Sequence, residues 1–484
     1  MKRHYYLVSS FFLMSTLALA SAGASPLHVN QIVAWMVGEI PEARLSQLVD
    51  QRGIASTPDD FCIKALRGAG AQRQLVEKIR KAHPATSLND ECTPKLERIG
   101  KLAQQQDYVE VERLLKELVQ QDPANAAYHF ALGAILRREE KWDEAFDEFS
   151  ESARLMPDLS ETHSRLAFLF FRSDDPENAI AEARTALSMD PGNAEGYKLL
   201  GLGFYGSGRY EAALHAFQES LASSPSNPDV YYDMGMALRD KGDLTGAAAA
   251  YRDAIRLKPS YWEAHSNLGL VLHDQHKLDE AIVEYQEAKR LAPNEPAVRS
   301  NLGSSYCDQG AFDAAIREFR DLARVAPTWQ AGHACMAKAL MAKHEYEAAI
   351  SELRLTVEQN PTGAAEHRVL GQALMLTGKD QEGLRELQIA ITLNPDSAAA
   401  HHYLGTAFNS LKDYRRAAKE FQEALRLEPS ADNHYYLAAC LINLGSYDEA
   451  LAELETAARL DPEKPVYRAR KDELLRIIKA GETR

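Results

Sequence analysis

The chain has 484 residues, 45% of them hydrophobic, a composition typical of a globular protein and not of a disordered, collagen-like or multi-span membrane protein. Its 70 acidic residues outnumber its 55 basic residues, which gives a formal net charge of −15. Because a phosphate backbone attracts a basic surface, this balance argues against nucleic acid as a ligand. At roughly 150 residues per domain, the length alone would suggest about three domains.

The N-terminus has the pattern of a secretory signal peptide. Lys2 and Arg3 precede an uncharged apolar run over residues 5–20, and small residues follow at 22–24. A basic end, an apolar stretch and a small-residue cleavage site are the features of such a peptide. We therefore assign residues 1–24 to a signal peptide and expect an exported protein, periplasmic or extracellular, with an uncleaved membrane anchor as the alternative. No lipid-modifiable Cys follows the site, and no later stretch has the ~20 apolar residues of a membrane span.

Residues 25–91 are predicted to form a small helical module. The pattern favours helices at 27–37 and 41–51, a third that begins at Pro58, and a fourth that ends at Lys81, with turns at 52–54 and 68–70. This region is too small for a large core of its own, but it could dock on the segment that follows. No specific motif attaches it to a family.

The five cysteines are read in the oxidising setting that export implies. Cys62 and Cys92 are candidates for a structural disulfide at the end of the module, although the sequence does not show connectivity. Cys335 and Cys440 fall within helix-patterned segments, where a free Cys usually packs as a small hydrophobe. The repeat pattern described next places Cys307 on a surface position, where we expect it to be solvent-accessible.

Prolines recur with a period of 34 residues through most of the remaining chain. They are Pro123, Pro157, Pro191, Pro225, Pro259, Pro293, Pro327, Pro361, Pro395 and Pro429. Each unit also has Leu-Gly at positions seven and eight, an aromatic residue or Leu near seventeen, Ala at twenty and a large apolar residue at twenty-four. The fourth unit shows the whole pattern in Leu200-Gly201, Tyr210, Ala213, Phe217 and Pro225. Small residues at eight and twenty let two helices approach closely, so each unit is predicted to be a helical hairpin.

This pattern resembles the tetratricopeptide repeat family over residues 92–464. The resemblance implies an all-α fold, a right-handed superhelical solenoid of about 11 hairpins of 34 residues, preceded by the small module. Residues 465–484 are predicted to form a C-terminal capping helix and tail, because a repeat array needs a polar end. The resemblance also implies that the first helix of each hairpin lines a concave groove.

Positions two, five, nine, twelve and thirteen of each unit are free of the hairpin's own packing, so their residues report on the ligand. In units two to five they form an apolar, aromatic wall, and the alternative is that neighbouring groups cover it. The wall residues are Phe130, Phe168, Phe171, Leu202, Tyr205, Tyr232 and Met236. Acidic rows accompany the wall, and later units become more polar. These charged candidates are Asp240, Asp274, Asp308, Lys338 and Arg368, beside a position-two row of Glu161, Glu195, Asp229 and Glu263.

Two patterns in the sequence resemble a nucleotide-binding motif and a set of metal ligands, but neither fits this architecture. Gly201, Gly203 and Gly206 match G-x-G-x-x-G, but they fall in a predicted helix and its turn and not after a buried strand. Histidines recur at position four of many units, where packing is the favoured interpretation, because helices 8–10 Å apart cannot share one zinc ion. These are His129, His163, His265, His333, His367 and His401. We predict no enzyme activity, no cofactor and no metal site.

The function predicted from sequence is an exported protein-interaction scaffold. Its groove would bind a peptide or helical segment of a partner protein in the assembly of an envelope complex. The acidic rows suit a basic or amphipathic segment. Two alternatives stay open. In the first, the array selects substrates for a glycosyltransferase whose catalytic domain is on another chain. In the second, the module binds a cell-envelope polymer. The sequence does not give the oligomeric state.

Overall fold

The computed structural model describes residues 25–82, 84–85, 92–326 and 332–482 of the chain. The predicted signal peptide, residues 1–24, lies outside the described residues. Within them the regular structure consists of 27 helices, with two isolated β-bridges and no longer strand, so the all-α prediction is confirmed. The chain divides into two compact units, one ending at Leu257 and one beginning at Lys258, and each is described by itself. Of the described helices, none is both long and apolar enough to cross a bilayer.

The module begins the first unit with four short helices, close to the predicted ranges. They are α1 (Val29–Val37), α2 (Glu42–Arg52), α3 (Asp60–Gly68) and α4 (Arg73–Lys81). Isolated parallel bridges join Leu27 to Ile54 and Ile54 to Pro84, and they tie together the segments between the helices. The Asp59 side chain accepts a hydrogen bond from the Cys62 amide and caps α3, which sets where this helix starts.

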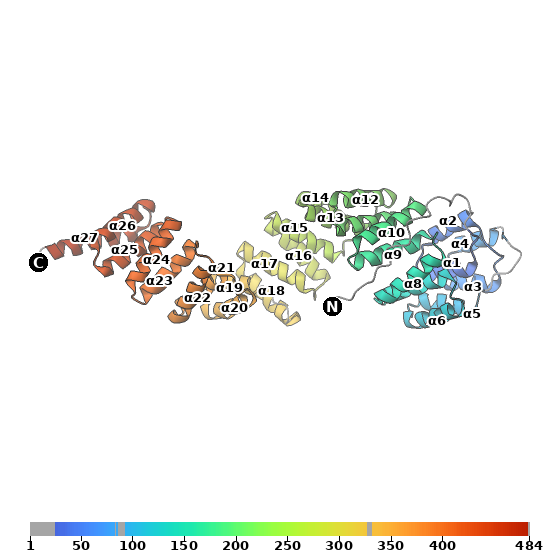
Figure 1. Cartoon of the computed structure of the whole chain (residues 1–484), viewed down its shortest axis with the longest axis horizontal. Helices are drawn as coiled ribbons and strands as arrows, with labels where there is room; N and C mark the ends of the chain where they lie inside the picture. The colour runs from blue at the N-terminus through green and yellow to red at the C-terminus, as the bar shows by residue number, and fades with distance from the viewer. Residues whose placement is uncertain (1–24, 83, 86–91, 327–331, 483–484) are drawn as a thin grey trace, which may run out of the picture. The chain divides into compact units, whose positions relative to one another are not determined.

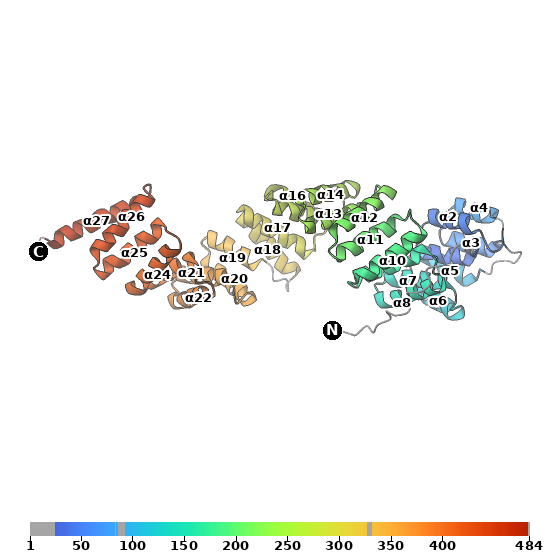
Figure 2. The same cartoon turned by 45° about the horizontal axis from the view of Figure 1, so that its top comes forward.

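The module does not have a separate core. Trp35 of α1 is fully buried in one apolar cluster that also contains Leu96 and Ile135 of the repeats. Gly38 lies so close to the Phe130 ring that an added Cβ would come within 2.6 Å of it, so this backbone approach requires glycine. Both views place the module against the start of the repeat array (Figures 1 and 2). The predicted docking of the module on the repeats is confirmed.

The rest of the first unit consists of helical hairpins in sequence order. Their helices are α5 (Pro94–Gln104), α6 (Tyr108–Gln121), α7 (Ala126–Arg138), α8 (Trp142–Leu155), α9 (Ser160–Arg172), α10 (Pro176–Met189), α11 (Ala194–Gly206), α12 (Tyr210–Ser223), α13 (Pro228–Lys241) and α14 (Leu244–Leu257). Within a hairpin the helices pack as predicted, since the ring of Phe217 in α12 lies directly against Gly201 in α11. Asn193 accepts a hydrogen bond from the Gly196 amide and starts the next first helix.

The second unit continues the same construction. Its helices are α15 (Trp262–Asp274), α16 (Leu278–Leu291), α17 (Pro296–Gln309), α18 (Phe312–Val325), α19 (His333–Ala342), α20 (Tyr346–Gln359), α21 (Ala364–Leu376), α22 (Asp380–Leu393), α23 (Ala398–Ser410), α24 (Tyr414–Leu427), α25 (Ala431–Leu444), α26 (Tyr447–Leu460) and α27 (Pro465–Glu482). The last of these packs on α26 and buries Tyr467 and Leu474, each 1% exposed. The Tyr467 hydroxyl donates to Asp432, 2.6 Å away.

The hairpin of α21 and α22 departs from the pattern in an informative way. Gly383 stands where other units have Ala, which leads us to expect a loose hairpin from the sequence. The structure shows the opposite, because Gly383 and Gly371 bring the two backbones together. A Cβ added at Gly383 would lie 2.9 Å from the Gly371 carbonyl oxygen. The two helices therefore approach each other closely at the position where other units have the methyl group of Ala.

Candidate functional site: the inner helices and a cavity beside the module

The first helices of successive hairpins form a continuous surface in the first unit. Helix α9 contacts α11, and α11 contacts α13, so their side chains meet across repeat boundaries. The predicted wall residues lie on these helices. Phe171, Tyr205, Tyr232 and Met236 are all half-buried, which leaves part of each side chain available to a ligand. The wall is therefore present along α9, α11 and α13, although neighbours cover much of it.

Phe130 is not part of this surface, so its assignment to the groove is wrong. It is 0% exposed, because Gly38 and the rest of the module cover it, and its ring packs at 5.4 Å from that of Phe149. The sequence does not reveal this, since Phe130 occupies the same repeat position as groove residues of other units. The module thus covers the inner surface of the second repeat.

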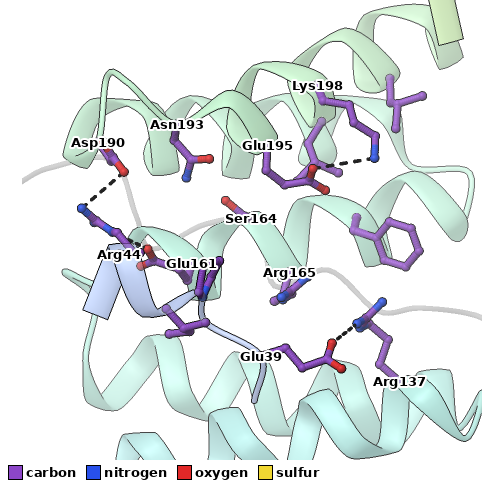
Figure 3. A pocket seen from close by; sticks show the side chains of 15 residues that line it. Glu39, Arg44, Arg137, Glu161, Ser164, Arg165, Asp190, Asn193, Glu195 and Lys198 are labelled. Carbon is purple, nitrogen blue, oxygen red and sulfur yellow. Dashed lines mark hydrogen bonds and ion pairs between the residues drawn. The ribbon is translucent and has the colours of Figure 1, made fainter. Parts of the chain in front are cut away.

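A cavity of about 570 Å³ opens where the covered surface ends. One side is the segment between α1 and α2 together with the first turn of α2, and the other sides are α7, α9, α11 and the turn after α10. Apolar atoms come from Ile40, Phe168, Leu199 and Leu202. Figure 3 shows the charged side chains of the cavity, which reach it from both the module and the repeats. Two predicted wall residues, Phe168 and Leu202, therefore belong to this cavity, and Leu202 is nearly buried.

Most charges of the cavity are already paired. Arg44 Nε lies 2.5 Å from Glu161 Oε1, and another nitrogen of Arg44 lies 3.4 Å from Asp190. These contacts fix α2 to α9 and to the turn after α10. The charge of Glu161, a member of the predicted acidic row, is thus neutralised by Arg44 of the module. It is not available to a basic ligand.

The other two carboxylates of the cavity, those of Glu39 and Glu195, also have cationic partners. Arg137 lies 3.1 Å from Glu39, which also contacts Arg138. Lys198 lies 3.7 Å from Glu195, a looser contact on the surface of α11. Each of the four carboxylates that line the cavity therefore has a cation beside it.

Arg165 of α9 is different from the other cations. Among the described residues its guanidinium has no hydrogen bond and no ion pair, and Figure 3 shows it in the middle of the cavity without a partner. Burial lowers the pKa of Arg165, and the nearby Arg137 lowers it further, while Glu195, Glu39 and Glu161 raise it in part. Arg165 is half-buried and remains a cation, as an arginine does.

The remaining acidic candidate of the first unit has a local partner. Asp240 is exposed and accepts a hydrogen bond of 2.6 Å from the hydroxyl of Tyr205. Burial and this hydrogen bond raise the pKa of Tyr205, so the phenol stays protonated. The contact joins α11 to α13 along the wall. It also orients the Tyr205 ring toward its neighbours on that surface.

In the second unit, the predicted charged residues form a separate group. Asp308 lies 3.1 Å from His273 Nε2 and 3.7 Å from Lys338 Nζ, and Asp274 is exposed nearby on α15. Lys338 also lines a cavity of about 570 Å³ with apolar residues of α19 and α21. Arg368 is half-buried, with its guanidinium 5.8 Å from the centre of the Tyr403 ring. Asp308 thus pairs with His273 and Lys338, whereas Arg368 interacts with Tyr403.

The cysteines form two pairs. Cys62 and Cys92 are joined by a disulfide between α3 and the start of the repeats, at the place the sequence suggests. Cys307 and Cys335 form a second disulfide, between α17 and α19, and Cys307 is only 3% exposed. The expectations of an accessible Cys307 and a free Cys335 are therefore wrong. Cys440 is a free, buried thiol whose pKa burial raises to about 11.

The position-four histidines act within the hairpins. In His129, His163, His265, His367 and His401, one ring nitrogen contacts a Glu nineteen residues later and the other contacts the carbonyl of the Pro six residues earlier. His333 makes the Glu contact, to Glu352. Each such imidazole therefore joins both helices of a hairpin to the preceding turn, which confirms the packing interpretation. Groups of three or more metal-ligating side chains are not found in the described ranges.

Sequence reasoning missed Arg165, although a signal for it exists. Position six of repeats two to ten carries a charged residue only twice, at Arg165 and Asp233. Both lie between first helices, where a charge is costly unless it is paired. Asp233 is 8% exposed, and one of its oxygens is buried without a hydrogen bond. A search for charges at an otherwise uncharged repeat position would have found both.

Comparisons with known proteins agree with this architecture. The tetratricopeptide repeat model matches residues 102–159, 165–228 and 232–296. A second model, described as anaphase-promoting complex, cyclosome, subunit 3, matches residues 387–457. None of the curated proteins compared with the chain matches it.

Solved structures with helical repeats are similar to parts of the chain. A tetratricopeptide repeat protein from Parabacteroides merdae is 18% identical, over 52% of this chain and 100% of its own, with a TM-score of 0.38. A chain of the Cut9–Hcn1 hetero-tetramer of APC/C is 13% identical, over 87% of this chain and 93% of its own, with a TM-score of 0.39. YrrB, a tetratricopeptide repeat protein described as having an unusual peptide-binding site, is 21% identical, over 40% of this chain and 97% of its own, with a TM-score of 0.33. These likenesses are too distant to transfer a ligand. Residues 102–159, 165–228 and 232–296 match tetratricopeptide repeats, and the described repeat region forms an all-α array of helical hairpins.

Proposed function

We propose that this chain is an exported, non-enzymatic scaffold that binds a polypeptide segment of a partner protein on the inner helices of its repeats. The observation that carries the proposal is the row of half-buried Phe171, Tyr205 and Met236 on three successive first helices. Aromatic side chains that keep part of their surface in contact with water supply binding area without a large loss of side-chain entropy. Repeat solenoids offer such surfaces to extended chains or helices.

The chemistry of the surface suits an amphipathic segment. Apolar side chains of the partner would contact the wall, and its polar side chains would face carboxylates such as Asp240 at the edge. Because Glu161 and Glu195 are paired within the chain, a strongly basic partner gains less from this region than the sequence suggests. The lining of the cavity consists of apolar groups, the Ser164 hydroxyl, the Asn193 amide, and guanidinium, ammonium and carboxylate groups.

Export and a role in assembling an envelope complex belong to the same proposal. The apolar N-terminal run supports export, and so do two disulfides, because such bonds form and persist in oxidising compartments. N-terminal sequencing of the protein recovered from the envelope tests this part. A chain that begins at Ser25 is expected, and recovery of an uncleaved chain in the cytoplasm would contradict it.

Site-specific crosslinking tests the binding surface. A photoreactive amino acid placed at Tyr205, on the inner helix α11, should capture the partner in the native envelope. His215 on α12 is the matched control, since its side chain is 76% exposed on the second helix of the same hairpin. Replacement of Phe171 and Met236 by Ser, with the photoreactive amino acid kept at position 205, should abolish recovery of the captured protein. Equal capture from positions 205 and 215, or unchanged recovery by the double variant, would show that the wall is not the binding surface.

A further inference from the structure

One segment of the module is basic although the chain as a whole is acidic. Residues 61–81, which contain most of α3 and all of α4, carry six basic side chains and one acidic side chain, against 55 and 70 in the whole chain. Both views place α3 at the end of the first unit that lies away from α13 and α14 (Figures 1 and 2). The basic segment therefore lies outside the wall on α9, α11 and α13.

Helix α3 presents one aromatic and two basic side chains to solvent. Phe61, Lys64 and Arg67 are exposed, and their spacing of three residues puts them on one side of the helix. The other side of α3 is buried in the apolar cluster that the module shares with the repeats. The disulfide from Cys62 to Cys92 ties α3 to the segment before α5. The three exposed side chains are thus held on a fixed surface.

Helix α5 brings a third cation to this surface. A Cβ added at Gly100 of α5 would lie 2.7 Å from the backbone nitrogen of Ala69, so the turn after α3 packs directly on α5. This close approach places Lys101 with Lys64 and Arg67 around a hollow of about 560 Å³. We call the surface formed by Phe61, Lys64, Arg67 and Lys101 the basic face.

The cations of the basic face outnumber the carboxylates beside it. Among the described residues that line the hollow, Glu97 is the one acid, and its carboxylate lies 2.6 Å from Lys101 Nζ. Lys64 and Arg67 are exposed and form no ion pair with a described residue. Surface cations that lack carboxylate partners attract anions from solution. The basic face therefore favours an anionic ligand.

Phe61 favours a bilayer over other anionic ligands. Its side chain is 43% exposed at the start of α3, and Lys64 Nζ lies 5.4 Å from the centre of the ring. An apolar ring beside cations is the arrangement with which interfacial helices contact a membrane, because the ring enters the head-group region while the cations stay at the phosphates. An anionic bilayer repels most of this acidic chain and attracts the basic face, which sets the orientation of binding.

We propose that the basic face docks the chain on the surface of a bilayer that contains anionic phospholipids. Lys64, Arg67 and Lys101 would contact lipid phosphates, and the Phe61 ring would lie between the head groups. One ring and a few cations give reversible, peripheral binding. The wall on α9, α11 and α13 stays available to a partner, and the proposal does not depend on what binds there.

Vesicle flotation tests the docking. The chain is used from Ser25 onward, the product expected after cleavage of the signal peptide. Vesicles of phosphatidylcholine alone are compared with vesicles that contain about one-third phosphatidylglycerol. We expect the chain to float with the anionic vesicles at about 0.05 M salt and to be released at about 0.5 M, because salt screens the cations. Equal binding to both kinds of vesicle, or no binding to the anionic ones, would overturn the proposal.

A pair of double variants separates the basic face from the net charge of the chain. Lys64→Gln with Arg67→Gln should lower the partition onto anionic vesicles about 25-fold, since each cation near such a surface contributes about fivefold. Arg415→Gln with Lys419→Gln removes two exposed cations of α24 and should leave the partition unchanged. Both variants should keep the thermal midpoint of the parent chain, because the altered side chains are exposed. Equal losses in the two variants would refute a role for the basic face.

Fluorescence quenching by brominated lipid tests whether position 61 enters the bilayer. Phe61→Trp should add quenching beyond that of the parent chain. Val283→Trp is the control, because this side chain is 61% exposed on α16, and it should add none. If the Lys64→Gln and Arg67→Gln pair abolished vesicle binding but Phe61→Trp added no quenching, the basic face would be a site for soluble polyanions. The bilayer proposal would then be wrong.

Discussion

In the third repeat, Nδ1 of His163 lies 2.6 Å from Oε2 of Glu182, and Nε2 lies 3.1 Å from the carbonyl oxygen of Pro157. One imidazole thereby connects the two helices of its hairpin and the end of the hairpin before it. His129 and His265 make the same two contacts, so this imidazole bridge recurs along the repeats. Its protonation is coupled to folding.

The stability of the chain should therefore fall as the pH rises above about 6.5. Burial by itself lowers the pKa of His129, His163 and His265, but their Glu and Pro carbonyl partners outweigh burial, so the pKa in the folded chain is raised. A raised pKa stabilises the fold fully below the unfolded value of about 6.5, and this gain is lost as the pH passes the folded value. His163→Gln should lower the thermal midpoint at pH 5.5 more than at pH 8.5. An unchanged pH profile would contradict the coupling, and the exposed His215→Gln is the control.

Asp233 makes a second, independent contribution to pH dependence. Burial raises the pKa of its carboxyl to about 7; Asp229 and Glu195 raise it too, and Lys198 opposes them. Because the folded pKa lies above the unfolded value near 4, stability is lost as the pH rises between about 4 and 7. Asp233→Asn should raise the free energy of unfolding by a few kcal/mol at pH 8 and have little effect at pH 4. Urea titrations at both pH values measure this, and a destabilised variant at pH 8 would refute it.

Thiol counting tests the disulfide pattern. A chain purified without reductant should show no reactive thiol when folded, because Cys440 is buried and its pKa is raised. In denaturant one thiol should react, and after reduction all five should. Three reactive thiols in denaturant would mean that one of the two disulfides is absent, and five would exclude both bonds.

Phe130 and Phe171 should behave in opposite ways although they lie on neighbouring first helices. Phe130→Ala removes a fully buried ring and should destabilise the chain by about 3–5 kcal/mol. Phe171→Ser changes a half-buried side chain and should mainly weaken partner capture. The two variants are compared by urea unfolding and by crosslinking at Tyr205. If Phe130→Ala leaves stability intact, the module does not cover that ring as described.

The hairpins were predictable because their determinants are local and repeated. Regular prolines mark where the second helices end, the Leu-Gly pair marks where the two helices of a hairpin make contact, and the module's helices fall close to their expected bounds. The cavity was not predictable, since it depends on contacts such as Arg44 with Glu161, which are 117 residues apart and carry no periodic signal. The pairing of Cys307 with Cys335 was missed for a similar reason, because each Cys was judged by its own helix pattern and not by the neighbouring helix.

The disulfide between Cys62 and Cys92 affects the order in which the hairpins unfold. Repeat arrays lose their hairpins from the ends, one after another. At the N-terminal end of the described chain, that disulfide and the burial of Trp35 hold the first hairpins, while α27 is held by packing and by the hydrogen bond from Tyr467 to Asp432. Under a pulling force, hairpins should therefore detach starting at α27. The cavity beside the module would keep its shape until the last steps of this unfolding.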